Sequence, residues 1–255
     1  MMLNARLSGE GPRIVLLHPI GLDHSFWGDV EVSLAQTCCV LSVDLRGHGA
    51  SSWDGGPVSL EQNADDVAQL LSALDFAPAI VVGLSFGGMI AQTLAIRRPD
   101  LVRGLVVSGC ADTLPDAARS AMRERGRIAL ENGMETVIDA TMERWFSPGF
   151  ADIDWLDKVR ERLRTDDPEV WAAGWDAISA LNTAPMLASL SVPALVIAAE
   201  NDQAFPVEAV HNVARHIPAA RFEVLEGAAH IMHLEKPEPY ARLIQNFVND
   251  LDATA

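Results

Sequence analysis

Short apolar runs rich in valine, isoleucine and leucine recur along the chain, separated by longer helical stretches. The runs are apolar at consecutive positions, which is typical of parallel strands buried on both faces. We predict strands at Leu3–Leu7, Arg13–His18, Val40–Val43, Ala79–Gly83, Gly104–Ser108, Ala194–Ala198 and Arg221–Leu225. Their alternation with helices predicts an α/β fold, with a mostly parallel central sheet flanked by helices and right-handed crossovers.

The clearest helical pattern runs from Leu60 to Leu74. Ser59 precedes this pattern as the predicted N-cap, and Gln62 stands three positions later, as in a capping box. These two residues predict where the helix between the third and fourth strands begins.

One segment interrupts the alternation of strands and helices. Between about Pro115 and Leu190 the sequence shows four helical patterns and no convincing strand. The patterns are Asp116–Glu131, Met134–Trp145, Ile153–Arg164 and Pro168–Leu181. We therefore predict a helical cap at residues 115–190, inserted in a core formed by residues 1–114 and 191–255. A lid over a site is the favoured role for it, and the alternative is a plain extension of the helical layer.

The sharpest local signal for chemistry is a G-x-S-x-G motif formed by Gly83, Ser85 and Gly87. The motif lies between a predicted strand and a helical pattern that ends before Pro99. Small residues on both sides allow a tight turn that projects a strained serine outward, so we predict Ser85 as a nucleophile. The alternative is a strand-to-helix turn with an ordinary N-cap serine.

A serine hydroxyl is a weak nucleophile at neutral pH and needs a base, which is most often histidine. His230 comes just after the last predicted strand and is the predicted base. His233, three residues further along, is the reserve candidate. His211 and His216 lie in a helical stretch and are predicted to have surface or structural roles. His18, His24 and His48 lie near strand ends, where they could line the site without acting as the base.

The base needs an acid that orients it. Asp202 follows the predicted strand before that of His230, so the chain order becomes Ser, Asp, His. Asp112, after the preceding strand, and Glu200 are the alternatives. On chain order we predict that Ser85, Asp202 and His230 form a catalytic triad.

The anion that forms when a carbonyl is attacked needs two backbone N–H donors. Phe86, directly after the predicted nucleophile, supplies the first N–H. The loop after the second strand should supply the other donor. Pro19 in this loop has no N–H, so Ile20 is the predicted second donor.

Composition narrows the choice of partners and location. The formal net charge of −16 comes from 35 acidic and 19 basic residues, in a chain that is 49% apolar. Nucleic acid and anionic membranes are poor partners for so acidic a chain. No apolar run reaches the roughly 18 residues of a membrane helix, and no export signal is recognisable. Three cysteines without metal-ligand spacing predict a reduced, cytoplasmic protein without a metal site.

Taken together, these motifs resemble the α/β-hydrolase superfamily over nearly the whole chain. The resemblance rests on His18–Gly21, Asp44–Gly49, the turn at Ser85, Asp202 with Pro206, and Gly227 with His230. It implies an eight-stranded, mostly parallel sheet with a helical cap. The chain departs from the family at Pro19, where a glycine is usual, and in an N-terminus too short for the first edge strand.

Within this superfamily the chain most resembles 3-oxoadipate enol-lactonases. The shared features are Leu17–Trp27, Gly83–Met89 and the cap residues Glu143–Pro148. A substrate of this kind carries a carboxylate, which the net charge of −16 would repel. A local cation must then compensate, so Arg144 is the predicted carboxylate partner and Trp145 the predicted pocket wall. The alternative for Arg144 is a position on the surface.

The sequence therefore predicts a serine hydrolase that cleaves a small ester or lactone without any cofactor, as a monomer or homodimer. A serine at position 85 argues against haloalkane dehalogenase and epoxide hydrolase chemistry, for which this superfamily uses an aspartate. Cofactor-free perhydrolysis, hydrolytic C–C cleavage and a non-catalytic small-molecule receptor stay open as alternatives.

Overall fold

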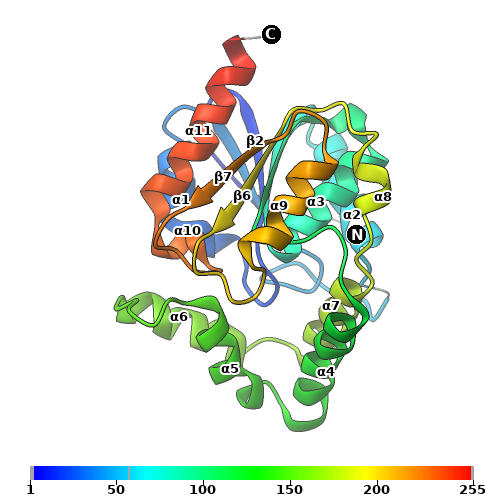
Figure 1. Cartoon of the computed structure of the whole chain (residues 1–255), viewed down its shortest axis with the longest axis vertical. Helices are drawn as coiled ribbons and strands as arrows, with labels where there is room; N and C mark the ends of the chain where they lie inside the picture. Colours follow the sequence, from blue (N-terminus) through cyan, green and yellow to red (C-terminus); the bar gives the residue numbers. More distant parts are fainter. Residues whose placement is uncertain (1–2, 57, 254–255) are drawn as a thin grey trace.

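The computed structural model describes residues 3–56 and 58–253, which form one seven-stranded sheet (Figure 1). The strand order is β1-β3-β2-β4-β5-β6-β7, and only the pair of β1 and β3 is antiparallel. The strands are β1 (Ala5–Ser8), β2 (Arg13–Leu17), β3 (Cys39–Val43), β4 (Ala79–Leu84), β5 (Val102–Ser108), β6 (Ala194–Ala199) and β7 (Arg221–Leu225). The predicted mostly parallel sheet is confirmed. The resemblance implied eight strands, but the described residues form seven.

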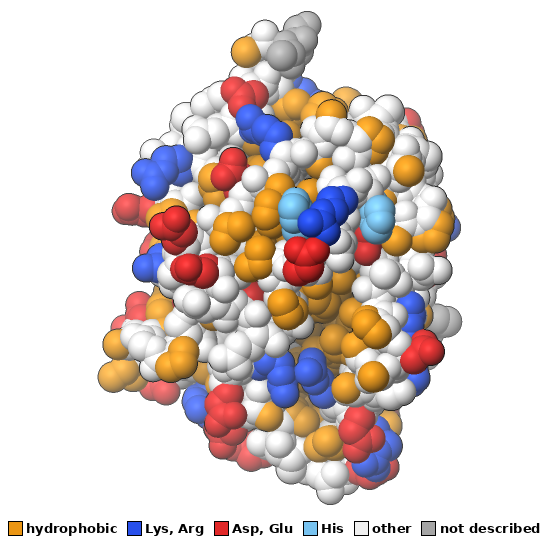
Figure 2. All heavy atoms as spheres, viewed as in Figure 1, with side chains coloured by type: hydrophobic (Ala, Val, Ile, Leu, Met, Phe, Trp, Pro, Cys, Tyr) orange, Lys and Arg blue, Asp and Glu red, His pale blue; other side chains and the backbone are white. Residues whose placement is uncertain are grey.

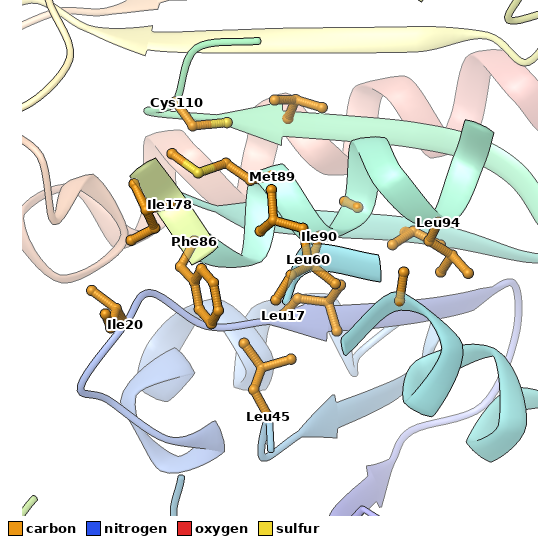
Figure 3. Packing of buried hydrophobic residues seen from close by; sticks show 14 of the residues in the cluster. Leu17, Ile20, Leu45, Leu60, Phe86, Met89, Ile90, Leu94, Cys110 and Ile178 are labelled. Carbon is orange, nitrogen blue, oxygen red and sulfur yellow. The ribbon is translucent and has the colours of Figure 1, made fainter. Parts of the chain in front are cut away.

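Helices cover both faces of the sheet, because successive side chains of each buried strand point to opposite faces. In β2, Ile14 and Leu16 pack in the cluster that includes α1 and α11, while Val15 and Leu17 pack with α2, α3 and α9. Figure 3 shows part of the cluster that contains Leu17 and residues of α2 and α3. The helices of the core are η1 (His24–Trp27), α1 (Gly28–Leu34), α2 (Leu60–Ala73), α3 (Phe86–Arg97), η2 (Pro99–Leu101), α9 (Val207–His216), α10 (Met232–Glu235) and α11 (Pro237–Ala253).

Helix α2 begins where the sequence predicts. The hydroxyl of Ser59 accepts a hydrogen bond from the backbone N–H of Gln62 at 3.0 Å. The side-chain NH2 of Gln62 donates to Asp66 at 3.3 Å, and in the described residues its oxygen accepts no bond from the backbone N–H of Ser59. The predicted N-cap is therefore confirmed, whereas the reciprocal bond of a capping box is missing among the described residues, since the Gln62 side chain is directed toward Asp66.

The chain between β5 and β6 is helical. It forms α4 (Asp116–Asn132), α5 (Glu135–Trp145), α6 (Ile153–Arg164), α7 (Pro168–Ser179) and the short α8 (Ala184–Leu187). Figure 1 shows α4 to α7 on the side toward which the arrows of β6 and β7 point, which is the carboxyl end of the parallel strands. Active sites of open α/β sheets lie at this end. We refer to residues 115–190 as the cap, a division that stays a prediction.

The cap packs directly on the loop after β2. A Cβ atom added to Gly21 would lie 2.7 Å from the ring of Trp171, and one added to Gly174 would lie 2.7 Å from Ile20. The guanidinium group of Arg162 on α6 pairs with Asp23 in this loop at 3.0 Å. The loop that contains the predicted donor Ile20 is therefore enclosed by cap residues.

No helix in the described part of the chain is long and apolar enough to cross a membrane.

Candidate active site

The turn between β4 and α3 holds Ser85 in a strained conformation. Its backbone has φ 56° and ψ −116°, which residues with a side chain rarely adopt. A Cβ atom on Gly83 would lie 2.2 Å from the carbonyl oxygen of Gly87, and one on Gly87 would lie 2.0 Å from that of Leu17. Only glycine fits at both positions, so the G-x-S-x-G pattern reflects the steric demands of this turn.

Three residues from separate strand ends meet at this turn. Nε2 of His230 lies 2.9 Å from Oγ of Ser85, and Nδ1 lies 2.9 Å from Oδ2 of Asp202. All three side chains are buried. An ionised carboxylate only accepts, so with Asp202 ionised Nδ1 carries the proton and Nε2 accepts the serine hydroxyl. The structure thus brings together the three residues that chain order predicts.

The loop after β6 fixes the orientation of Asp202. Its Oδ1 accepts the backbone N–H groups of Ala204 at 2.7 Å and Phe205 at 3.0 Å, which leaves Oδ2 for His230. The two backbone bonds hold the carboxyl group in one orientation, which suits an acid that orients a histidine.

The alternative acids bond elsewhere. Asp112 is buried and lies 2.6 Å from Nδ1 of His216 at the end of α9. The carboxylate of Glu200 accepts the backbone N–H of Gly227 at 2.8 Å. Neither makes a hydrogen bond to His230 among the described residues, so the geometry favours Asp202.

Two further histidines near the site are held in their neutral form. His18 donates from Nδ1 to the carbonyl of Pro19 at 2.7 Å and accepts the N–H of Leu45 on Nε2 at 3.0 Å. Burial lowers the pKa of His18 to about 3, and burial lowers the pKa of the reserve candidate His233 to about 3 as well. His233 lies against the ring of Trp27, with 5.0 Å between centroids. His18 therefore supports the loop after β2, and His233 lies in the hydrophobic interior.

The remaining histidines contact groups outside the triad. These contacts are a hydrogen bond of His24 with Asp44, a hydrogen bond of His48 with the carbonyl of Arg46, and stacking of His211 on Phe222.

The two predicted oxyanion donors lie beside Ser85. Phe86 is the first residue of α3, where a backbone N–H has no partner within the helix. Ile20 lies in a turn closed by a hydrogen bond from the N–H of Leu22 to the carbonyl of Pro19 at 3.3 Å, and it lines the same pocket as Ser85. In the described residues neither Ile20 nor Phe86 donates its N–H to another group. Proline at position 19 is compatible with this turn because its role there is that of an acceptor.

A narrow pocket connects Ser85 with the cap. Its free volume is about 10 Å³, roughly the space of one water molecule. Figure 2 shows a hollow between core and cap, with hydrophobic walls and blue Lys or Arg side chains at its lower margin. The pocket is lined by Ile20, Ser85, Arg125, Thr141, Arg144, Trp145, Trp175, Ile178, Ala204, Phe205 and His230.

The predicted cap residues both line this pocket, and a second arginine joins them. Trp145 is buried, with its ring 6.3 Å from that of His230. Arg144 faces the pocket but also donates to the carbonyl of Ala140 in its own helix at 2.9 Å. Sequence reasoning missed Arg125 on α4. Burial, together with the nearby charge of Arg144, lowers the pKa of Arg125 to about 10.

The helical spacing of α4 contains the signal for Arg125. The buried residues of α4 are Met122, Gly126 and Ala129, so an arginine at position 125 falls on the buried stripe. Its guanidinium group lies 5.0 Å from the centre of the Trp175 ring. Neither Arg125 nor Arg144 pairs with a carboxylate in the described residues. Two cations without anionic partners among the described residues therefore face the buried Ser85.

One group of side chains has the composition of a cation site. Atoms of Asp23, His24 and Asp44 lie within 4.8 Å of one another. Asp44, however, already accepts bonds from Asn4 and from the backbone and ring of His24, and Asp23 caps η1. These bonds account for the group as a support of the loop after β2.

Comparisons with known proteins agree with this architecture. Residues 14–243 match the family described as "Alpha/beta hydrolase family". The chain is 30% identical over 238 residues to 3-oxoadipate enol-lactonase 2 of Acinetobacter baylyi, covering 92% of this chain and 88% of that protein. The crystal structure of the enol-lactonase from Burkholderia xenovorans LB400 superimposes with a TM-score of 0.92 at 30% identity, covering 97% and 96% of the two chains. A thermophilic esterase from Thermogutta terrifontis with malate bound gives a TM-score of 0.91 at 26% identity, covering 98% and 93%.

Proposed function

This chain belongs to the alpha/beta hydrolase family, and we propose that it is a serine hydrolase of small esters or lactones that carry a carboxylate. Its compared relatives are named lactonases and esterases, so the enzyme class is that of a hydrolase. The observation that carries the proposal is the unbroken chain of hydrogen bonds from Ser85 through His230 to Asp202.

In the proposed reaction His230 takes the proton of the Ser85 hydroxyl on Nε2 while Oγ attacks the substrate carbonyl. The N–H groups of Phe86 and Ile20 stabilise the negative charge on the carbonyl oxygen. His230 then gives the proton to the oxygen that leaves, and Asp202 stabilises the imidazolium form. Water, deprotonated by His230, attacks the acyl-enzyme and frees Ser85. His230 carries every proton transfer and returns the last proton to Oγ of Ser85, so no cofactor is required.

The arginines support a substrate with a negative charge. In a chain of net charge −16, a carboxylate needs local cations to enter the site. Arg125 and Arg144 face Ser85 from the cap and pair with no carboxylate in the described residues. The relatives support the same class, because one is named for an enol-lactone and another holds malate. We propose that 3-oxoadipate enol-lactone, or a lactone of similar size and charge, is the substrate.

The decisive experiment compares the wild type with Ser85→Ala. The panel contains 3-oxoadipate enol-lactone, a neutral γ-lactone and p-nitrophenyl acetate. We expect the anionic lactone to be the fastest substrate and Ser85→Ala to lower its kcat by at least about 10³-fold. Circular dichroism verifies that the variant is folded.

Three outcomes contradict the proposal in different parts. Retained turnover by Ser85→Ala would exclude this nucleophile. Preference for the neutral substrates would exclude the role of the arginines. Failure of a fluorophosphonate probe to label Ser85, together with no turnover of the panel, would favour a receptor.

A further inference from the structure

One carboxylate outside the triad bonds both to the cap and to the loop of the proposed base. Glu235, the last residue of α10, is half-buried. Its Oε1 accepts the backbone N–H of Ser147 at 2.6 Å, and its Oε2 accepts the hydroxyl of Ser147 at 3.0 Å. Oε2 also accepts the backbone N–H of Ala229 at 2.7 Å. A single side chain therefore joins segments more than 80 residues apart in the sequence.

The two joined segments contain groups that face the pocket. Ala229 directly precedes His230, and Ser147 lies two residues after Trp145. A backbone hydrogen bond from Ile231 to the carbonyl of Trp145 at 3.1 Å joins the same segments again. His230 is thus flanked on both sides by residues that are tied to the cap or to the carboxylate.

The chemistry of these contacts requires a carboxylate. All three hydrogen-bonding partners of Glu235 are donors, and an ionised carboxylate has two oxygens that only accept. The described residues place no arginine or lysine within ion-pair distance of it. Its charge therefore strengthens bonds to N–H and O–H groups instead of forming a salt bridge. A glutamine has one accepting oxygen and cannot keep all three bonds.

We propose that Glu235 is a positioning residue that couples the pocket wall at Trp145 to the base His230. The inference rests on the proposed function, because it gives His230 the role of base. The cap end of α5 and the loop of His230 are then held as one unit, so the position of Trp145 and the alignment of Nε2 with Ser85 are maintained together. Small displacements of a reacting group are costly, since about 1 Å lowers rates by about 100-fold.

The test uses Glu235→Gln and Glu235→Ala in the full chain, with Glu238→Gln as the matched control. Glu238 is an exposed glutamate three residues further along. The first readout is the rate at which a fluorophosphonate probe labels Ser85, which depends on His230 and needs no knowledge of the substrate. The second is kcat and KM for p-nitrophenyl acetate and for the anionic lactone, measured well below the melting temperature.

We expect Glu235→Gln to lower the labelling rate and kcat by about tenfold, and Glu235→Ala by about 100-fold. Glu238→Gln should match the wild type. A purely structural role would lower the melting temperature and leave both rates unchanged, and this result would overturn the proposal. The proposed function would survive that result, provided that labelling and turnover still depend on Ser85.

A second variant keeps the proposal testable if the Glu235 variants fail to fold. Ser147→Ala removes one bond to the carboxylate and keeps the backbone N–H. As a single variant it should raise the KM for the anionic lactone about threefold. Where Glu235→Gln folds, this effect should vanish in that background, because coupled residues are not additive. An unchanged KM in the single variant, or additive effects in the pair, would contradict the coupling.

Discussion

The core wall and the cap wall of the pocket are held in place in different ways. On the core wall Ser85 and His230 bond across elements, and His230 continues to Asp202. On the cap wall Arg144 bonds to a carbonyl of its own helix, and Arg125 contacts the sulfur of Met122 one turn away. Long-range bonds fix the proposed chemical groups, while the cations keep their charge available for a ligand.

Under the proposed function, the residues of the core wall carry out the reaction and those of the cap wall recognise the substrate. Strand ends determine where the core residues lie, so their geometry follows from the sheet itself. The cap residues stand on helices that contact the core through side chains and through the backbone bond from Ile231 to Trp145, and their positions depend on packing. Changes to the core wall should therefore abolish turnover, and changes to the cap wall should alter which substrates are accepted.

The largest expected effect distinguishes the two histidines on the core side of the site. His230→Asn should lower kcat by at least about 10³-fold, because within residues 3–56 and 58–253 no other basic side chain bonds to Ser85. His233→Phe should keep kcat within about threefold, since its ring lies against Trp27 and makes no bond to Ser85. Steady-state kinetics on the fastest substrate measure both. Equal losses for the two variants would refute the assignment of His230.

The next effect compares glycines of the two regions. Gly87→Ala places a Cβ 2.0 Å from a carbonyl oxygen, so we expect a loss of about 3 kcal/mol in the free energy of unfolding. Gly149→Ala in the cap meets nothing within 4 Å and should change that free energy by less than about 0.5 kcal/mol. Urea unfolding measures both values. An unchanged free energy of unfolding in Gly87→Ala would show that the turn at Ser85 is less constrained than its geometry indicates.

A smaller effect separates binding from chemistry on the cap wall. Arg125→Met and Arg144→Met should each raise the KM for the anionic lactone by roughly 10- to 100-fold, because a charged hydrogen bond contributes about 1.5–3 kcal/mol. The turnover of p-nitrophenyl acetate should stay unchanged. Arg127→Met is the matched control, since Arg127 lies on the same helix but is exposed. Equal losses on charged and neutral substrates would contradict a role in recognition.

The smallest effect is a dependence of the free energy of unfolding on pH. It arises from core residues, because residues 115–190 contain no histidine. The pKa values of His18 and His233 are lowered to about 3 from an ordinary value of 6.5. The unfolded chain therefore binds more protons between pH 6.5 and 3. The free energy of unfolding should fall as the pH decreases, by up to about 1.4 kcal/mol per pH unit for each histidine.

Urea unfolding of the wild type and His233→Phe at pH 7, 6 and 5 checks this dependence. The variant should lose stability less steeply on acidification. Identical slopes would show that folding does not lower the pKa of His233.

The strand ends were predictable from the sequence because buried parallel strands leave continuous apolar runs. The prediction is least accurate at β1, which was placed at Leu3–Leu7 and lies at Ala5–Ser8. β5 also starts at Val102 and not at Gly104, since the exposed side of the strand carries Arg103. The candidate triad followed from chain order alone, and the structure brings its members within hydrogen-bond distance. Local sequence is informative wherever the sheet dictates position.

Contacts between distant helices were not predictable in the same way. Arg125 faces Ser85 only because α4 packs against α7 in the cap. Spacing along α4 places it on the buried stripe but does not show what it faces. The bond of Asp112 to His216 likewise joins two segments whose approach depends on tertiary packing. Sequence reasoning leaves such pairs open because propensity and periodicity describe each element alone.

The backbone of Ser85 places a limit on how this protein can be stabilised. Its positive φ is a conformation that glycine accepts freely and serine adopts at a cost of about 1–3 kcal/mol. Ser85→Gly should therefore relieve strain and yield an inert chain that is harder to unfold. Selection for fold stability alone would favour a residue other than serine at this position. A serine at this position therefore lowers the stability of the fold, and the proposed nucleophile is the role that accounts for this cost.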